Sequence, residues 1–197
     1  MSPRSQPALA GGLRVVLAAA ALAVVSAAAE EPEPLRIPQV EVRLAGREVH
    51  VETRLSPGLP ADVRKRLVSG LPTTVVWEVR LMVLRNKWWD GLRDERSYAI
   101  TAAFRPESGD YAVERRLDGR LLETVVLPTR EEAEQALVRV PGIPCFTLGP
   151  YVAGVPLVVR VRAVYGTHMA LGFVPARTMT DWRRSPDFRW AEPGGPP

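Results

Sequence analysis

The chain has 197 residues, of which 26 are Lys or Arg and 22 are Asp or Glu, and its formal net charge is +4 at neutral pH. The single cysteine excludes an internal disulfide bond. Acidic and basic residues are interspersed, and no basic stripe alternates with aromatic residues, so the sequence does not predict a nucleic-acid-binding surface.

Residues 1–29 have the pattern of a secretory signal peptide. Arg4 and Arg14 provide a basic start, residues 15–29 are apolar, and small residues precede Glu30. This apolar run is shorter than the roughly 20 residues that cross a bilayer. We therefore expect cleavage after Ala29 and a periplasmic or exported protein. An uncleaved segment that anchors the protein in the inner membrane is the alternative, and it is the only membrane contact that the sequence indicates.

The remaining residues have the length of one domain. Residues 30–38 carry three prolines and three acids, which predicts an N-terminal tether that does not pack. We expect one domain over residues 39–190 and a disordered tail over residues 191–197.

The first predicted elements are a hairpin and a short helix. Residues 40–44 and 48–54 alternate apolar and polar side chains on either side of Ala45-Gly46, which is typical of a hairpin with one wet face. Residues 60–69 predict a helix that starts at Pro60 and ends at Gly70.

Residues 71–105 contain the strongest strand signal in the chain. Apolar residues recur at every second position in residues 75–83 and again in residues 98–104, so each run has a continuous apolar face. The polar residues 86–95 are expected to form the loop between these two strands.

The second half continues the pattern. Asp118-Gly119 predicts a two-residue hairpin turn, and Thr129 with Glu132 predicts a capping box at the start of a second helix that ends at Pro141-Gly142. Residues 157–165 predict a long strand, and residues 169–173 are expected to return against it. The predicted fold is mainly β: an antiparallel β-sandwich, or an open barrel, of seven or eight strands with two short helices.

Candidate catalytic and metal-binding groups are few. His50 with Glu48 and Glu52 shares one strand face, but zinc needs three or four ligands and only His168 offers a second imidazole, so a solvated sheet face explains these residues. The acidic pairs at 94–95 and 131–134 fit a strand entrance and the first turn of a helix. Cys145 has apolar neighbours and is expected to be buried; a disulfide bond between two chains is the alternative. We predict no metal, no cofactor and no enzymatic activity.

Two aromatic clusters are the candidate interaction residues. They are Trp88, Trp89 and Asp90 in a loop, and Trp182, Phe188 and Trp190 near the C-terminus. Tryptophan and arginine are enriched in the hot spots of protein interfaces, and tryptophan also stacks on sugars. The alternative is that these aromatic side chains pack onto the sheets.

The chain resembles the bacterial family called domain of unknown function 4390, over about residues 38–190. The resemblance depends on Gly70-Leu71-Pro72 before a strand with Glu78, on Trp88-Trp89-Asp90, and on the close from Leu171-Gly172-Phe173 to Trp190. Phe188 stands where the family pattern has tryptophan. The family has no assigned activity; its members are exported, and in some genomes they stand beside sensor histidine kinases.

These observations together predict an exported envelope protein that acts by binding rather than by catalysis. The expected partner is an envelope protein or the ectodomain of a sensor kinase. A module that binds lipid or glycan is the alternative.

Overall fold

The structure is a computed structural model that describes residues 34–85, 90–170 and 174–191, and the side chains among them except those of 167–170 and 174–176. The chain divides into two compact units, Met1–Pro32 and Glu33–Pro197, and every described residue belongs to the second. The predicted signal peptide and residues 192–197 of the predicted tail therefore lie outside the described residues.

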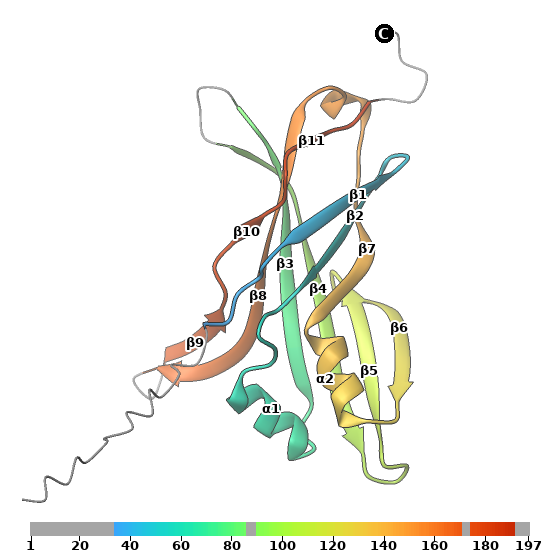
Figure 1. Cartoon of the computed structure of the whole chain (residues 1–197), viewed down its shortest axis with the longest axis vertical. Coiled ribbons are helices and arrows are strands. Elements are labelled where there is room, and N and C mark those ends of the chain that lie inside the picture. Colours follow the sequence, from blue (N-terminus) through green and yellow to red (C-terminus); the bar gives the residue numbers. More distant parts are fainter. Residues whose placement is uncertain (1–33, 86–89, 171–173, 192–197) are drawn as a thin grey trace, which may run out of the picture. The chain divides into compact units, whose positions relative to one another are not determined.

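The described residues form eleven strands, two α-helices and one short 3-10 helix, as labelled in Figure 1. The strands are β1 Val40–Ala45, β2 Glu48–Arg54, β3 Thr73–Val83, β4 Gly91–Arg105, β5 Asp110–Leu117, β6 Arg120–Leu127, β7 Arg139–Thr147, β8 Pro156–Ala170, β9 Val174–Met179, β10 Arg183–Arg184 and β11 Phe188–Arg189. The helices are α1 Ala61–Val68, α2 Arg130–Leu137 and the 3-10 helix η1 Pro150–Val152.

The strands form two antiparallel sheets. The smaller sheet has the order β1-β2-β7, and the larger has the order β10-β8-β3-β4-β5-β6, with β9 and β11 also paired to β8. The larger sheet does not close into a barrel. A mainly antiparallel β fold with two short helices is thus confirmed. The strand number exceeds seven or eight because β7 and the short strands β10 and β11 add to the predicted set.

The hydrophobic core lies between the two sheets. Figure 1 shows β1, β2 and β7 crossing over β8, β3 and β4, and the buried side chains of both sheets belong to one cluster. Trp77 and Val79 on β3 and Val49 and Val51 on β2 are fully buried within it. Burial of each such side chain stabilises the fold by about 1.5–3 kcal/mol, so the alternation in the sequence translates directly into the position of the core.

The two helices cover the inner side of the larger sheet beyond the smaller one. α2 begins with the predicted capping box: Thr129 Oγ1 accepts from the Glu132 backbone N–H at 3.2 Å, and Glu132 Oε2 accepts from the Thr129 backbone N–H at 3.3 Å. α1 buries Val63 and Leu67, and Gly70 follows it with a positive φ of 79°. Both helices are thus confirmed, but the predicted end of the second at Pro141-Gly142 is wrong: α2 ends at Leu137, because the chain pairs with β2 as strand β7 from Arg139.

Strand β7 was not predicted, because Pro141 and Pro144 argue against a strand interior. The strand accommodates them at an edge of the smaller sheet with two register shifts, one between Val49 and His50 and one between Val51 and Glu52 on the neighbouring β2. Such bulges leave residues unpaired, so a strand that contains prolines can still form the edge strand of a sheet.

Two strand boundaries differ from the sequence prediction. β4 starts at Gly91, so much of the predicted loop is strand, and its polar residues extend the pairing with β3 as far as Val83 opposite Gly91. Met169 belongs to β8, and the return strand is β9; residues 171–173 lie outside the description. Pairing to a long neighbour, rather than local alternation, sets both boundaries.

The described end of the predicted tether, residues 34–38, packs against the domain. Arg36 and Ser56 exchange two backbone hydrogen bonds of 2.9 Å, and Ile37 is 4% exposed within the core cluster. The expectation that residues 30–38 do not pack is therefore wrong for this end, because an apolar residue between two prolines can still enter a core.

Candidate functional site

Charged side chains gather on the outer face of the larger sheet, opposite the core. On β3 and β8 they alternate with the buried apolar residues, and the register places Glu78 opposite Arg162 and Arg80 opposite Arg160. We call the following group the arginine–tryptophan cluster: Glu78, Arg80, Asp90, Glu95, Arg160, Arg162 and Trp182.

Each arginine of the cluster has a carboxylate partner. Nε and Nη2 of Arg162 lie 2.7 and 2.6 Å from Oε2 of Glu78, in side chains that are only 25% and 19% exposed. Arg160 Nη2 donates to Asp90 Oδ2 at 2.7 Å. Arg80 Nη2 donates to Glu95 Oε1 at 3.4 Å, and Arg80 Nε lies 3.2 Å from Glu95 Oε2. Three cations thus meet three anions, and the cluster is electrically balanced.

Trp182 completes the cluster from the C-terminal segment. It precedes β10, whose Arg183 is opposite Val161, so that Trp182 comes beside Arg162. The guanidinium carbons of Arg80 and Arg162 lie 4.4 and 4.5 Å from the centroid of the indole ring. Each cation–π contact is worth about 0.5–1 kcal/mol at an exposed site. The indole ring and the carboxylates of Glu95 and Glu78 therefore hold Arg80 and Arg162 in place together.

A groove adjoins this tryptophan. A cavity of about 410 Å³ lies between the segment Pro34–Pro38 and Asp181, Trp182 and Arg183. Trp182 is half-buried, and it therefore contributes both to the cluster and to the wall of a depression that a partner side chain could fill.

The six predicted interaction residues do not form one surface. Asp90 and Trp182 belong to the same cluster, joined through the arginines, although they come from distant parts of the chain. Phe188 is half-buried against the core, and Trp190 is 3% exposed. Trp88 and Trp89 lie outside the described residues.

Trp190 has a structural position. Its indole Nε1 donates to the Gly46 carbonyl oxygen at 2.8 Å, across the turn between β1 and β2. This contact ties the segment around Trp190 to the smaller sheet. Trp190 therefore packs onto the sheets, which was the alternative prediction for the aromatic residues.

A one-residue change of register separates Trp182 from Trp190. Arg184 is opposite Arg160, but Phe188 is opposite Leu157, where an unbroken register would place Pro156. A slip of one residue turns every following side chain to the other face of a sheet. The extra residue lies in the segment Ser185–Asp187 and directs Phe188 and Trp190 inward.

Arg80, Arg160 and Arg162 were not among the functional residues predicted from the sequence. Arg160 and Arg162 were visible as the charged half of an alternating strand, and Arg80 has the same spacing on β3. The signal that could have identified them is their position in the longest strands, because charges in the middle of a wide sheet need partners or a covering group.

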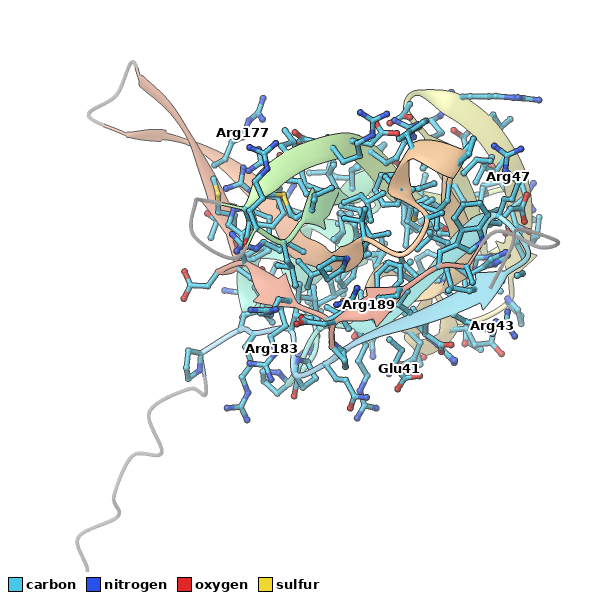
Figure 2. All side chains as sticks on the ribbon, turned by 90° about the horizontal axis from the view of Figure 1, so that it is seen from above. Glu41, Arg43, Arg47, Arg177, Arg183 and Arg189 are labelled. Atoms are coloured by element: carbon cyan, nitrogen blue, oxygen red, sulfur yellow. The ribbon has the colours of Figure 1, made fainter. Side chains whose placement is uncertain are left out.

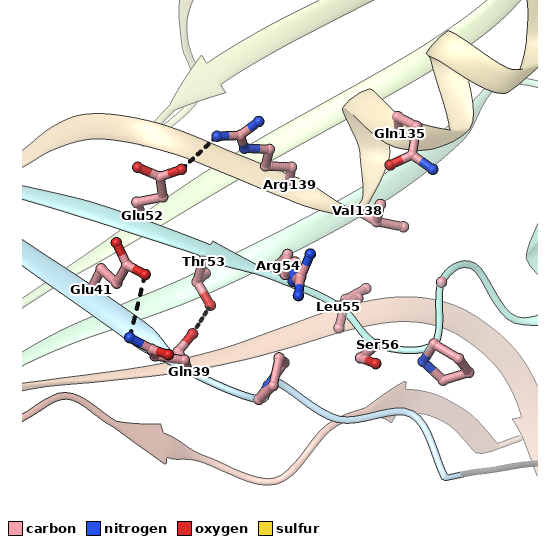
Figure 3. A pocket seen from close by; sticks show the side chains of 13 residues that line it. Gln39, Glu41, Glu52, Thr53, Arg54, Leu55, Ser56, Gln135, Val138 and Arg139 are labelled. Atoms are coloured by element: carbon pink, nitrogen blue, oxygen red, sulfur yellow. Dashed lines mark hydrogen bonds and ion pairs between the residues drawn. The ribbon is translucent and has the colours of Figure 1, made fainter.

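A second candidate site is a polar cavity of about 640 Å³ on the outer face of the smaller sheet (Figure 3). It lies where β1 and β7 begin and β2 ends, beside the C-terminal end of α2. Leu55, Thr53 and Val138 contribute buried side chains. The charged and amide side chains of the lining are Gln39, Glu41, Glu52, Arg54, Gln135 and Arg139.

A further seam runs along the side of the domain where β1 neighbours β10 and β11. Figure 2 shows Glu41 and Arg43 of β1 on the same side as Arg183 and Arg189. Val40 at the start of β1 and the residues from Arg183 to Asp187 line one cavity of about 460 Å³ there. The C-terminal segment thus covers the side of the core that β1 leaves open.

The remaining candidate groups are occupied by structural contacts. His50 binds the Gly142 carbonyl oxygen and Glu48 Oε2, both at 3.1 Å, while Glu52 pairs with Arg139 at 2.6 Å. Among the side chains that the structure describes, no group of three metal-ligating residues is placed to hold an ion; the side chain of His168, the second candidate imidazole, lies outside that description. Zinc binding by this strand face therefore has no support from its geometry.

Cys145 is buried, as predicted. Burial in the core raises the pKa of its thiol to about 12, so the thiol stays protonated at neutral pH. A protonated, buried thiol is a packing residue rather than a nucleophile.

Comparison with known proteins gives a family and no activity. Neither α1 nor α2, the α-helices of the described residues, has the length and apolar character needed to cross a membrane.

No curated protein and no solved structure matches the chain. The family model described as "Domain of unknown function (DUF4390)" matches residues 33–187, which contain nearly all of both sheets. The chain belongs to this family, and the resemblance stated from its sequence motifs is confirmed.

Proposed function

We propose that the protein is a non-catalytic interaction module that binds a partner protein through the arginine–tryptophan cluster. The observation that carries the proposal is the contact of Trp182 with both Arg80 and Arg162 on a half-exposed sheet face. Tryptophan and arginine are the residue types that dominate the binding energy of protein interfaces.

Preorganisation supports this role. Binding orders side chains at a cost of about 0.5–1.5 kcal/mol for each long side chain. The arginines of the cluster are already held by carboxylates and by the indole ring, so little further ordering is needed. The balanced charges favour a polar partner surface over a strongly acidic or basic one.

The expected partner is a protein of the bacterial envelope, including the ectodomain of a sensor kinase. Export through the N-terminal segment and the genomic neighbourhood that the family resemblance implies are the reasons for this choice. A lipid or glycan ligand stays the alternative, and the engagement of the indole ring by two guanidinium groups favours a protein over a stacked sugar.

A pulldown from envelope extract of the host tests the proposal. The tagged protein is compared with Trp182→Ala and with the control Tyr151→Ala, which removes an exposed aromatic residue that also contacts an arginine, Arg93, at 4.1 Å. We expect a partner that the wild type and Tyr151→Ala retain and Trp182→Ala loses, while both variants keep a cooperative thermal unfolding transition. Identical partner lists for all three proteins would contradict the proposal.

A further inference from the structure

We propose that the polar cavity of Figure 3 binds a small zwitterion, a molecule that carries an ammonium and a carboxylate group as an amino acid does. This site lies on the smaller sheet, and the proposal does not depend on the arginine–tryptophan cluster of the larger sheet. Its basis is an unusual arrangement of four charges.

Like charges lie directly opposite one another in two neighbouring rows of the smaller sheet. Glu41 on β1 is opposite Glu52 on β2, and Arg54 on β2 is opposite Arg139 on β7. Like charges at directly opposite positions destabilise a sheet. A ligand that places a positive group at the glutamates and a negative group at the arginines would relieve both repulsions.

Only one opposite-charge pair forms among these four side chains. Arg139 Nη2 donates to Glu52 Oε1 at 2.6 Å. Glu41 accepts a 3.3 Å hydrogen bond from the neutral amide of Gln39 and has no cationic partner among the described residues. Arg54 makes no hydrogen bond or ion pair to any described residue, and no dashed contact reaches it in Figure 3. One cation and one anion of the cavity are therefore uncompensated.

The spacing of the two uncompensated charges suits one small ligand. Glu41 and Arg54 are diagonal neighbours, because Arg54 follows by two positions the residue that faces Glu41. Diagonal neighbours in antiparallel strands are about 7–8 Å apart at their backbones, within reach of long side chains. An ammonium group at Glu41 and a carboxylate at Arg54 can thus belong to the same molecule.

The cavity also offers room and an apolar floor. Its volume of about 640 Å³ is within the range of about 300–1,000 Å³ that is usual for small-molecule sites. Leu55 and Val138 lie beneath the charged rows and are 4% and 7% exposed. An amino acid with an aliphatic side chain matches both the floor and the charges, so L-leucine is a suitable probe.

The test is a titration of the 15N-labelled protein with three molecules of similar size, followed by NMR. The probes are L-leucine, 4-methylpentanoate, which lacks the ammonium group, and 3-methylbutylamine, which lacks the carboxylate. We expect saturable shifts around the cavity with L-leucine and at least tenfold weaker binding of the other two. Equal binding of either single-charge analogue, or the absence of saturable shifts with L-leucine up to about 50 mM, would overturn the proposal.

Three variants locate the site. Arg54→Gln and Glu41→Gln each remove one charge and are expected to weaken leucine binding about tenfold, since a hydrogen bond to a charged group contributes roughly that factor or more. Arg43→Gln is the matched control, because Arg43 is an exposed arginine of the same sheet face, opposite His50 and outside the cavity. Its affinity should stay within twofold of the wild type, and an equal loss in this control would show non-specific binding and overturn the proposal.

Discussion

The two faces of β3 and β8 use the same alternating sequence for opposite purposes. On the inner face Trp77, Val79 and Val161 are fully buried and apolar. On the outer face, one residue further along each strand, Arg80 and Arg162 carry charges that are 34% and 25% exposed and already paired. The comparison indicates that the inner face supplies the stability of the domain, and that the outer face is available for recognition without loss of the fold.

The largest expected effect comes from making the same substitution on each face. Trp77→Ala should lower the free energy of unfolding by about 3–5 kcal/mol, because it leaves a large cavity in the core. Trp182→Ala should lower it by only about 1 kcal/mol, through the loss of cation–π contacts. Urea unfolding of both variants measures the difference, and equal losses would abolish the distinction between the faces.

A smaller effect concerns the alkaline stability of the inner face. Burial raises the pKa of Tyr98 from 10.0 to about 12. Below pH 10 both states hold the proton, and between pH 10 and 12 the unfolded state loses it first. The free energy of unfolding should therefore fall across this window, by up to about 1.4 kcal/mol for each pH unit.

Tyr98→Phe is the matched variant for this prediction. The buried Tyr98 hydroxyl has no hydrogen-bond partner among the described residues, so its removal should leave the stability at pH 7 unchanged or slightly higher. The variant should also lose less stability between pH 10 and 12 than the wild type. An equal alkaline slope in both proteins would show that the hydroxyl does not titrate as its burial requires.

The smallest expected effect is on the outer face. A double-mutant cycle of Glu78→Gln and Arg162→Gln should give a coupling energy of no more than about 1 kcal/mol, since partly exposed ion pairs contribute little to stability. Thermal or urea unfolding of the four proteins measures it. A coupling above about 3 kcal/mol would mark a buried structural pair, and the outer face would then share the role of the inner one.

The positions of the core and of most turns followed from the sequence. Asp118-Gly119 forms the predicted turn with positive φ angles of 48° and 81°, and the capping box at Thr129 begins α2 as expected. These features depend on neighbouring residues alone, so a local pattern is sufficient to predict them. Strand β7 escaped prediction because its prolines are tolerated only through bulges against β2.

The candidate site was predictable only in its parts. Asp90 and Trp182 were named as interaction residues, but their connection depends on Arg160 and Arg80, which face each other across β8 and β3. The same holds for the polar cavity, where Glu41, Glu52, Arg54 and Arg139 come from three strands. The local sequence pattern of a strand does not show which distant strand will pair with it.

By itself the sequence determined the family, the mainly antiparallel β fold and the apolar faces that form the core, because burial follows from the two-residue period of each strand. The tertiary structure decided which face the C-terminal aromatic residues occupy. One extra residue between β10 and β11 leaves Trp182 outside and turns Trp190 inward. The physical reason is that a register slip inverts a strand, and the register is set by the neighbouring strand rather than by the segment itself.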